Sequence, residues 1–304
     1  MKLTKAAIDA IYADAPTTGE LRALERLMSE RILSSIKEDE ESLLRHEKNY
    51  DQRIYVDMVW LDKIPLAKFR DSVKDCNGLK IGSKVEIGDL LIQRTRSQLH
   101  ADGSPHVISN RSLIVQAKVT RDAPAIVPIA STKVQKVTST TKELALLQHW
   151  PEFDLFEASR SSRAILERVK IDENRPHSFY GGFNTELQTW SFGRARKGEK
   201  CELDFCDLLT GLRDQSLGEM VTGSGTWPKL MDGVMRATRN RKIPKYLNSA
   251  VRDRVQSVEA SIAGFDFSAL LDCFRPKRMA ILMIDQVDFE GHEIGLLQSS
   301  FSGR

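Results

Sequence analysis

Apolar side chains recur every three or four residues through the first part of the chain. Residues 3–15 show this pattern in a short stretch that ends before Pro16, and residues 17–49 continue it over a longer one. The apolar positions of the longer stretch are Leu21, Leu24, Met28, Ile32 and Ile36. The spacing predicts two amphipathic helices, the second with one apolar face and a heavily charged, exposed end.

The middle of the chain alternates apolar runs with turn residues. Residues 53–64 fit either a strand or a short helix. Residues 80–97, punctuated by Gly82 and Gly88, predict one or two strands. The apolar run in residues 111–121 barely alternates, so it predicts a strand covered on both faces. The elements expected next are a capped helix at 139–150 and a short strand at 153–158. This order predicts an α/β fold, a mixed sheet flanked by helices.

Periodicity weakens beyond about residue 170. The segments 179–183 and 190–193 combine Gly with aromatic residues, and the first of them is interpreted as a turn. The helices expected in this half are 206–215, 226–238 and 246–262, and the strands expected at its end are 278–289 and 292–301. No linker rich in Pro, Gly or Ser separates the two halves. Residues 171–304 are therefore interpreted as an α+β elaboration of one domain or a closely packed subdomain.

The composition is that of an ordinary globular protein. Of 304 residues, 41% are hydrophobic and 29% are charged, and the net charge is +3. This small positive charge favours a polyanionic partner only slightly, and the basic clusters at 194–197 and 236–245 are first of all typical of solvated surface. No apolar run approaches the roughly 20 residues needed to cross a bilayer, so no membrane partner is expected.

The cysteines help to place the protein in a compartment. The chain has four, Cys76, Cys201, Cys206 and Cys273. Only Cys201 and Cys206 are close in sequence, and no second pair or His cluster completes a zinc site. Reduced thiols and a first segment without the apolar core of a signal peptide favour a cytoplasmic protein.

Polar side chains interrupt two of the apolar runs at their ends. Asp89 opens "DLLI", and Gln116 and Lys118 interrupt "SLIVQAKV". If these strands form an antiparallel hairpin, the three side chains meet at one end of the sheet, because Gln116 and Lys118 project from the same face. Asp89, the Gln116 side-chain carbonyl and the main-chain carbonyl of Ala117 offer the hard oxygens that Mg²⁺ or Mn²⁺ prefers. Lys118 can orient water or stabilise charge on a phosphate.

This arrangement resembles the core of the PD-(D/E)XK nuclease superfamily, in which an Asp on one strand is followed by E-x-K on the next. Here the Asp is Asp89, and the E-x-K position has Gln116, Ala117 and Lys118. The Q-x-K form is similar to that of the Mrr-like branch of restriction endonucleases. The resemblance covers about residues 17–157. The amide at position 116 lowers the negative charge of the site by one, which weakens metal binding or leaves a second metal site unfilled.

The resemblance implies a restriction-endonuclease-like fold, with a nuclease-like core at residues 1–170. It implies a metal-dependent endonuclease that hydrolyses phosphodiester bonds, those of DNA above all, in defence against foreign or damaged DNA. A homo-oligomer or a protein partner in a defence complex is compatible with that role. Basic side chains near the site are expected to hold phosphates, among them Arg94, Arg96 and Arg111. The alternative is an inactive nuclease-like module that binds nucleic acid or a protein.

Many members of this superfamily also place an acid from the preceding helix near the metal. The candidates are Glu20, Glu25 and Glu30. Glu25 lies beside the apolar stripe and could face the sheet edge, although an exposed helix position is the commoner role for such an acid. Glu86 lies three residues before Asp89. In a regular strand this odd spacing turns it to the opposite face, so Glu86 is left out of the site unless Gly88 lies in a bulge.

Overall fold

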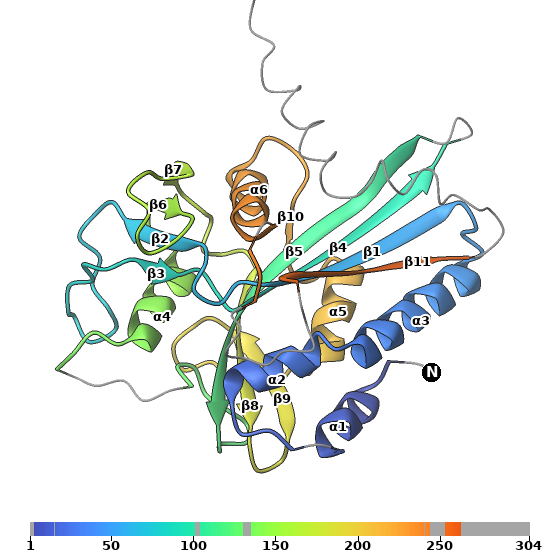
Figure 1. The fold of residues 1–304 in the computed structure, drawn as a ribbon, viewed down its shortest axis with the longest axis horizontal. Coiled ribbons are helices and arrows are strands. Elements are labelled where there is room, and N and C mark those ends of the chain that lie inside the picture. Colours follow the sequence, from blue (N-terminus) through green and yellow to red (C-terminus); the bar gives the residue numbers. More distant parts are fainter. Residues whose placement is uncertain are drawn as a thin grey trace, which may run out of the picture. The chain divides into compact units, whose positions relative to one another are not determined.

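The fold is α/β, with a mixed main sheet of seven strands and a second sheet of four. This computed structural model describes residues 3–14, 16–100, 104–129, 135–239, 241–243 and 253–262. Figure 1 shows the long strands of the main sheet beside the smaller sheet, which holds β2, β3, β6 and β7. The mixed, helix-flanked sheet expected from the sequence is confirmed at this level.

The main sheet has the order β11-β1-β4-β5-β8-β9, and β10 also pairs with β5. Its strands are β1 (Gln52–Trp60), β4 (Leu90–Leu99), β5 (Pro105–Thr120), β8 (Ser178–Asn184), β9 (Thr189–Arg194), β10 (Glu219–Met220) and β11 (Val255–Ser261). Only the β5–β8 pair is parallel among these strands. β4 and β5 form the expected antiparallel hairpin, with Leu90 opposite Val115.

The second sheet has the order β3-β2-β6-β7 and is antiparallel throughout. Its strands are β2 (Leu66–Phe69), β3 (Val85–Glu86), β6 (Phe153–Phe156) and β7 (Leu166–Val169). The short strand expected at 153–158 is therefore present, but it pairs with β2 rather than with the main sheet. The chain passes from the second sheet to the main one over the short connection between β3 and β4.

Six helices lie in the described residues: α1 (Lys5–Ala13), α2 (Glu20–Leu27), α3 (Glu30–Glu47), α4 (Ser139–His149), α5 (Phe205–Arg213) and α6 (Thr226–Arg239). Residues 17–49, expected to form one helix, form two. Ser29 leaves the helical conformation, with φ −69° and ψ 153°, and precedes α3. Serine is common at this position before a helix, although the Ser29 side chain makes no capping hydrogen bond here.

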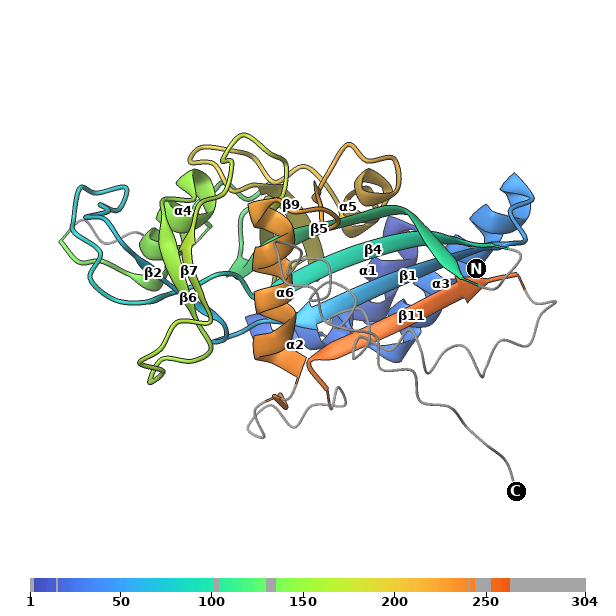
Figure 2. The ribbon, with the colours of Figure 1, turned by 90° about the horizontal axis from the view of Figure 1, so that it is seen from above.

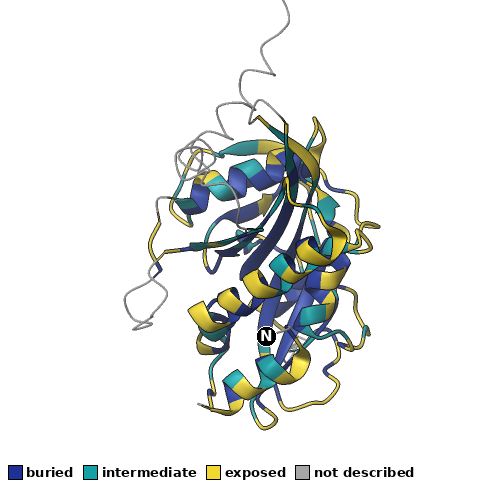
Figure 3. Cartoon of the chain, turned by 90° about the vertical axis from the view of Figure 1, so that its right-hand side faces the viewer, coloured by how far each residue is buried: buried dark blue, intermediate teal, exposed yellow. Residues whose placement is uncertain are grey.

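Two apolar cores cover the two faces of the main sheet. Leu90 and Ile92 face the core that includes side chains of α1, α2, α3 and α5. Leu91 and Ile114 face the other core, with side chains of α4 and α6. Figure 2 shows α6 on one side of the strands and α1 and α3 on the other. In Figure 3 the central strands are mainly buried, while the helices have buried and exposed sides. Burial on both faces explains why residues 90–92 of β4 and 113–115 of β5 are apolar without alternation.

The segment 179–183, expected to be a turn, is strand β8, and its neighbour at 190–193 lies in strand β9. Gly181 and Gly182 serve packing here rather than a turn. A Cβ at Gly181 would lie 2.7 Å from a ring carbon of Phe192, and one at Gly182 would lie 3.0 Å from the Cβ of Ala125. Glycine is therefore used where other side chains approach the strand closely.

The helix expected at 246–262 is wrong over its described part, because residues 255–261 form strand β11 on the edge of β1. Pairing with β1 outweighs the local helical pattern. Residues 278–289 and 292–301 lie outside the described residues. The sheet that contains β4 and β5 also contains β8, β9 and β11. Segments before and after residue 170 therefore belong to one sheet. None of the described helices is long and apolar enough to span a membrane.

Candidate active site

Gly88 brings the connection between β3 and β4 close against β5. Its φ of 153° is a conformation that favours glycine. A Cβ at this position would lie 2.4 Å from Cγ2 of Ile114 and 3.1 Å from the carbonyl oxygen of Val115. The next residue, Asp89, donates its main-chain amide to that same carbonyl over 2.9 Å. Because Gly88 has no side chain, the chain can pass this close to β5, and this close approach sets the position of Asp89.

The carboxylate of Asp89 is held by the strand that carries the Q-x-K residues. Its Oδ2 accepts the main-chain amide of Ala117 at 2.8 Å and the side-chain amide of Gln116. Asp89 is 2% exposed and Gln116 is 0% exposed. The buried Oε1 of Gln116 has no hydrogen-bond partner. The main-chain amide of Ala117 thus faces Asp89. The role of the Ala117 carbonyl as a metal ligand stays a prediction.

The ammonium of Lys118 lies among three carboxylates from three different elements. Its Nζ is 3.2 Å from Oε2 of Glu143, 3.8 Å from Oε1 of Glu20 and 4.0 Å from Oδ2 of Asp89. Burial opposes protonation of Lys118, but the surrounding carboxylates outweigh it and raise its pKa above the ordinary value. Lys118 is therefore a fixed cation and not a base near neutral pH.

Of the three candidate helix acids, Glu20, Glu25 and Glu30, it is Glu20 that lies at the site. Glu20 is the first residue of α2, and the start of that helix lies beside Lys118. Glu25 pairs with Arg22 at 2.9 Å and, with Glu30, lines a separate groove on the surface. The apolar stripe showed which side of the helix faces the sheet. It could not show which end of the helix lies over the ends of β4 and β5.

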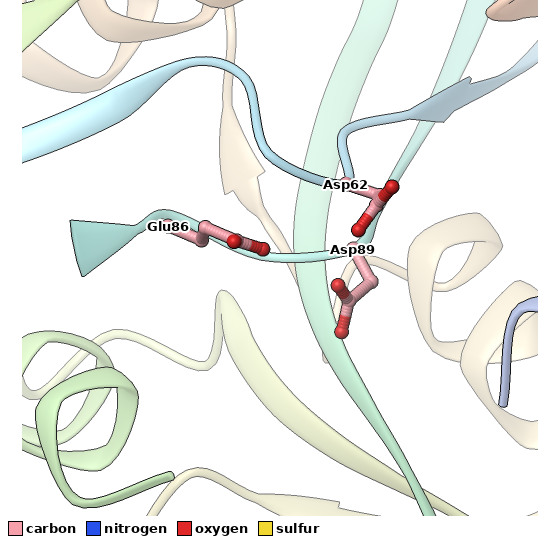
Figure 4. Close-up of side chains that lie close together, drawn as sticks. All are labelled: Asp62, Glu86 and Asp89. Carbon is pink, nitrogen blue, oxygen red and sulfur yellow. The ribbon is translucent and has the colours of Figure 1, made fainter. Parts of the chain in front are cut away.

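Two further acids join Asp89. One carboxylate oxygen each from Asp62, Glu86 and Asp89 lie within 4.8 Å of one another. Figure 4 shows Glu86 and Asp89 on the same stretch of chain and Asp62 on another. Sequence reasoning missed Asp62, which follows β1, and set Glu86 aside because of its odd spacing. The conformation of Gly88 breaks the regular alternation between Glu86 and Asp89. The glycine between them was the signal that could have kept Glu86 in the set.

The carboxylates at this site hold protons more tightly than usual. Burial raises the pKa of Asp89 well above its ordinary value; Lys118 opposes this, and Glu20 and Glu143 add to it. Burial raises the pKa of Glu20 to about 7. Burial also raises the pKa of Glu86. A site that gathers this many acids around one ammonium is short of positive charge near neutral pH.

The donor set fits a divalent cation with a preference for hard oxygen ligands. Oδ2 of Asp62 and Oε1 of Gln116 are buried and have no hydrogen-bond partner. Buried polar atoms are nearly always paired, so each unpaired oxygen needs an explanation, and a bound ion is one. A divalent cation would also favour the ionised form of Glu86 and Asp89, which burial otherwise disfavours. Mg²⁺ and Mn²⁺ match this oxygen set.

The three arginines expected to hold phosphates have protein partners. Arg94 is buried and donates to both carboxylate oxygens of Glu40, at 2.8 and 2.9 Å. The structure does not support a phosphate contact through Arg94, because its guanidinium is buried and two of its nitrogens donate to a carboxylate. Arg96 donates to Gln52 at 2.5 Å and pairs with Glu47. Arg111 donates to the carbonyls of residues 217 and 218. For the partly buried Arg96 and Arg111, the phosphate role stays a prediction.

Comparison with known proteins does not assign this site, because the chain matches no protein-family model, no curated protein and no solved structure.

Proposed function

We propose that this chain is a metal-dependent nuclease that hydrolyses phosphodiester bonds, with DNA as the first substrate to test. The observation that carries the proposal is the convergence of Asp89, Gln116 and Lys118 on one spot, with Asp62 and Glu86 alongside. The side chains of the expected Asp and Q-x-K pattern lie within a few ångströms of one another. Hard oxygens beside a buried ammonium are the groups that metal-assisted phosphate chemistry uses.

Asp62, Glu86 and Asp89 would hold the cation, and Oε1 of Gln116, which is buried and has no partner, would be the neutral oxygen to join them. When bound, Mg²⁺ or Mn²⁺ supplies Lewis-acid chemistry: it withdraws charge from the phosphate and makes water a better nucleophile. The contacts of Asp89 with Gln116 and Ala117 fix the direction of its carboxylate in advance. Such a fixed direction lowers the cost of ordering the site when the cation and the substrate arrive.

Lys118 acts in this proposal as a permanent positive charge. Its raised pKa keeps the ammonium protonated, and Glu143 and Glu20 hold it in place. An ammonium so placed stabilises the negative charge that builds on phosphate oxygens during hydrolysis. Glu20, with a pKa of about 7, is the side chain best poised to accept a proton from attacking water near neutral pH.

The preference for DNA and the role in defence come from the resemblance to Mrr-like restriction endonucleases. The positive net charge of +3 agrees with a polyanionic substrate. The same resemblance leads us to expect a homo-oligomer or a protein partner in a defence complex.

The amide at position 116 favours a second candidate, a nuclease-like module that binds nucleic acid without cutting it. One assay separates the two. Plasmid DNA is incubated with the protein and Mg²⁺ or Mn²⁺, with and without EDTA. Cleavage that needs the cation and stops with EDTA supports the nuclease. Binding of intact DNA that is the same with and without the cation supports the module and overturns the nuclease.

A further inference from the structure

A cavity of about 460 Å³ opens directly beside the candidate active site. It lies between the small sheet, through β2 and β3, and the first turns of α4. Its lining includes the lysines Lys68, Lys84 and Lys142 and the acids Glu86 and Glu143. Glu86 belongs to the acid cluster, and Glu143 is the nearest carboxylate to Lys118. The cavity and the candidate active site therefore share two residues.

The three lysines differ in how many partners their ammonium groups already have. Lys84 donates to the carbonyls of Ala158, Ser159 and Ser161 at 3.3, 3.1 and 2.7 Å, and its ammonium lies 3.9 Å from the ring centre of Phe156. Its donors are used up, so Lys84 braces the loop after β6.

Lys142 and Lys68 remain able to bind an anion. Within the described residues, the ammonium of Lys142 makes one hydrogen bond, to the hydroxyl of Ser83 at 3.1 Å. Lys68 is exposed and has no ion pair or hydrogen bond from its ammonium within the described part of the chain. Lys68 and Lys142 come from β2 and α4, so they approach the cavity from two separate elements.

Positive and negative side chains thus lie side by side here. Lys68 and Lys142 line the cavity, and the acid cluster adjoins it through Glu86, which belongs to both. A nucleic-acid strand carries a phosphate at every nucleotide, so it can place one phosphate at the cation and the next at the lysines. The volume is in the range of pockets that hold small molecules. A duplex needs a far larger surface, on the order of 1,000 Å² or more of protein.

We propose that this cavity binds the phosphate next to the scissile bond of a single nucleic-acid strand, with Lys68 and Lys142 as its contacts. The inference rests on the proposed nuclease function and narrows its substrate to single strands or unpaired strand ends. Serine hydroxyls of the lining, at Ser83, Ser139 and Ser159, offer hydrogen bonds to the same phosphate or its sugar.

The test is binding in EDTA, where no cation-dependent cleavage takes place. A fluorescein-labelled single strand of about 12 nucleotides is titrated with protein and followed by anisotropy. The double variant Lys68→Gln/Lys142→Gln is compared with Lys170→Gln/Lys229→Gln, which removes the same charge from exposed residues outside the cavity. Loss of two charged hydrogen bonds weakens binding by about tenfold or more. The salt slope of the binding constant falls by about 1.4, as expected for two phosphate contacts to a single strand.

The inference is overturned if the two double variants bind alike, if the wild type does not bind the strand, or if it binds a duplex of the same sequence equally well. A Lys68→Arg/Lys142→Arg variant keeps both charges and should keep binding, which separates charge from folding. Binding that depends on the lysines without any cleavage in Mn²⁺ would contradict the nuclease and leave this cavity assignment standing. Cation-dependent cleavage with no effect of the lysines would do the reverse.

Discussion

The carboxylate of Glu143, on α4, lies 3.2 Å from the ammonium of Lys118, on β5. This pair ties the helix that follows the β4–β5 hairpin to the residue at the end of the Q-x-K motif. Because Glu143 also lines the neighbouring cavity, the pair stands between the acid cluster and the lysines of that cavity. In the proposed nuclease, Lys118 therefore serves two purposes: it neutralises part of a carboxylate-rich site, and it presents a positive charge where a phosphate would bind.

Replacing Lys118 tests both purposes. Lys118→Met keeps the length of the side chain and removes its charge. We expect cleavage to fall by about 10²–10³-fold, the usual cost of losing one group that stabilises developing charge. The metal-free protein should also lose stability, because Glu143, Asp89 and Glu20 lose their common cation. Cleavage rates and thermal unfolding in EDTA measure the two effects. Lys229→Met, at an exposed position of α6, is the control and should change neither.

The amide at position 116 can be tested by restoring the commoner acid. Gln116→Glu adds a negative charge beside Asp89, with which the wild-type amide shares a hydrogen bond. Without metal the two carboxylates repel, so stability should fall; with a divalent cation the balance reverses, so affinity for Mn²⁺ should rise. Calorimetric titration of Mn²⁺ into both proteins decides the matter. Equal affinities would mean that Gln116 does not face the cation.

The pKa of Glu20 predicts how stability depends on pH. Burial raises this pKa from 4.5 to about 7, so the folded chain binds a proton that the unfolded chain has already released over that interval. The stabilising effect is complete below about pH 4 and is lost as pH rises through about 7. In EDTA, the melting temperature of the wild type should therefore decline over this range more steeply than that of Glu20→Gln. Parallel curves for the two proteins would contradict the placement of Glu20 in a buried acidic site.

The buried pair of Arg94 and Glu40 should matter to folding and not to DNA binding. Arg94→Met leaves Glu40 buried, and among the described residues its remaining cationic partner is Arg213, at 3.4 Å. A loss of about 3 kcal/mol in the free energy of unfolding is expected, and Arg94→Met/Glu40→Leu should recover much of it. Denaturant titration measures both. The affinity of the folded single variant for DNA should match the wild type; a weakened affinity would restore the phosphate role expected from the sequence.

The sequence was sufficient to predict the hairpin and its three polar side chains, because burial on both faces makes Asp89, Gln116 and Lys118 stand out from their apolar neighbours. It was not sufficient for Asp62 or Glu143. These residues lie 27 positions before Asp89 and 25 after Lys118, in segments whose local pattern contains no sign of a shared site. Their positions depend on how β1 ends and how α4 packs, which are properties of the assembled sheet.

Local patterns were misleading where packing decides the conformation. Gly181 and Gly182 suggested a turn, yet they allow Phe192 and Ala125 to approach strand β8. The end of the described chain was expected to be a helix, yet it pairs with β1 as β11. In both places a partner distant in sequence determines the structure, and a single sequence does not show that partner.

The most direct test of the account is the rate at which Asp89→Asn hydrolyses a labelled single strand of DNA in Mn²⁺. Asn keeps an acceptor for the amide of Ala117 but removes the charge that would hold the cation. We predict that the wild type cleaves, that EDTA stops it, and that Asp89→Asn is at least about 10²-fold slower while remaining folded. The control Asp71→Asn, at an exposed position, should match the wild type. Equal rates for Asp89→Asn and Asp71→Asn, or cleavage that persists in EDTA, would contradict a metal-dependent site at Asp89.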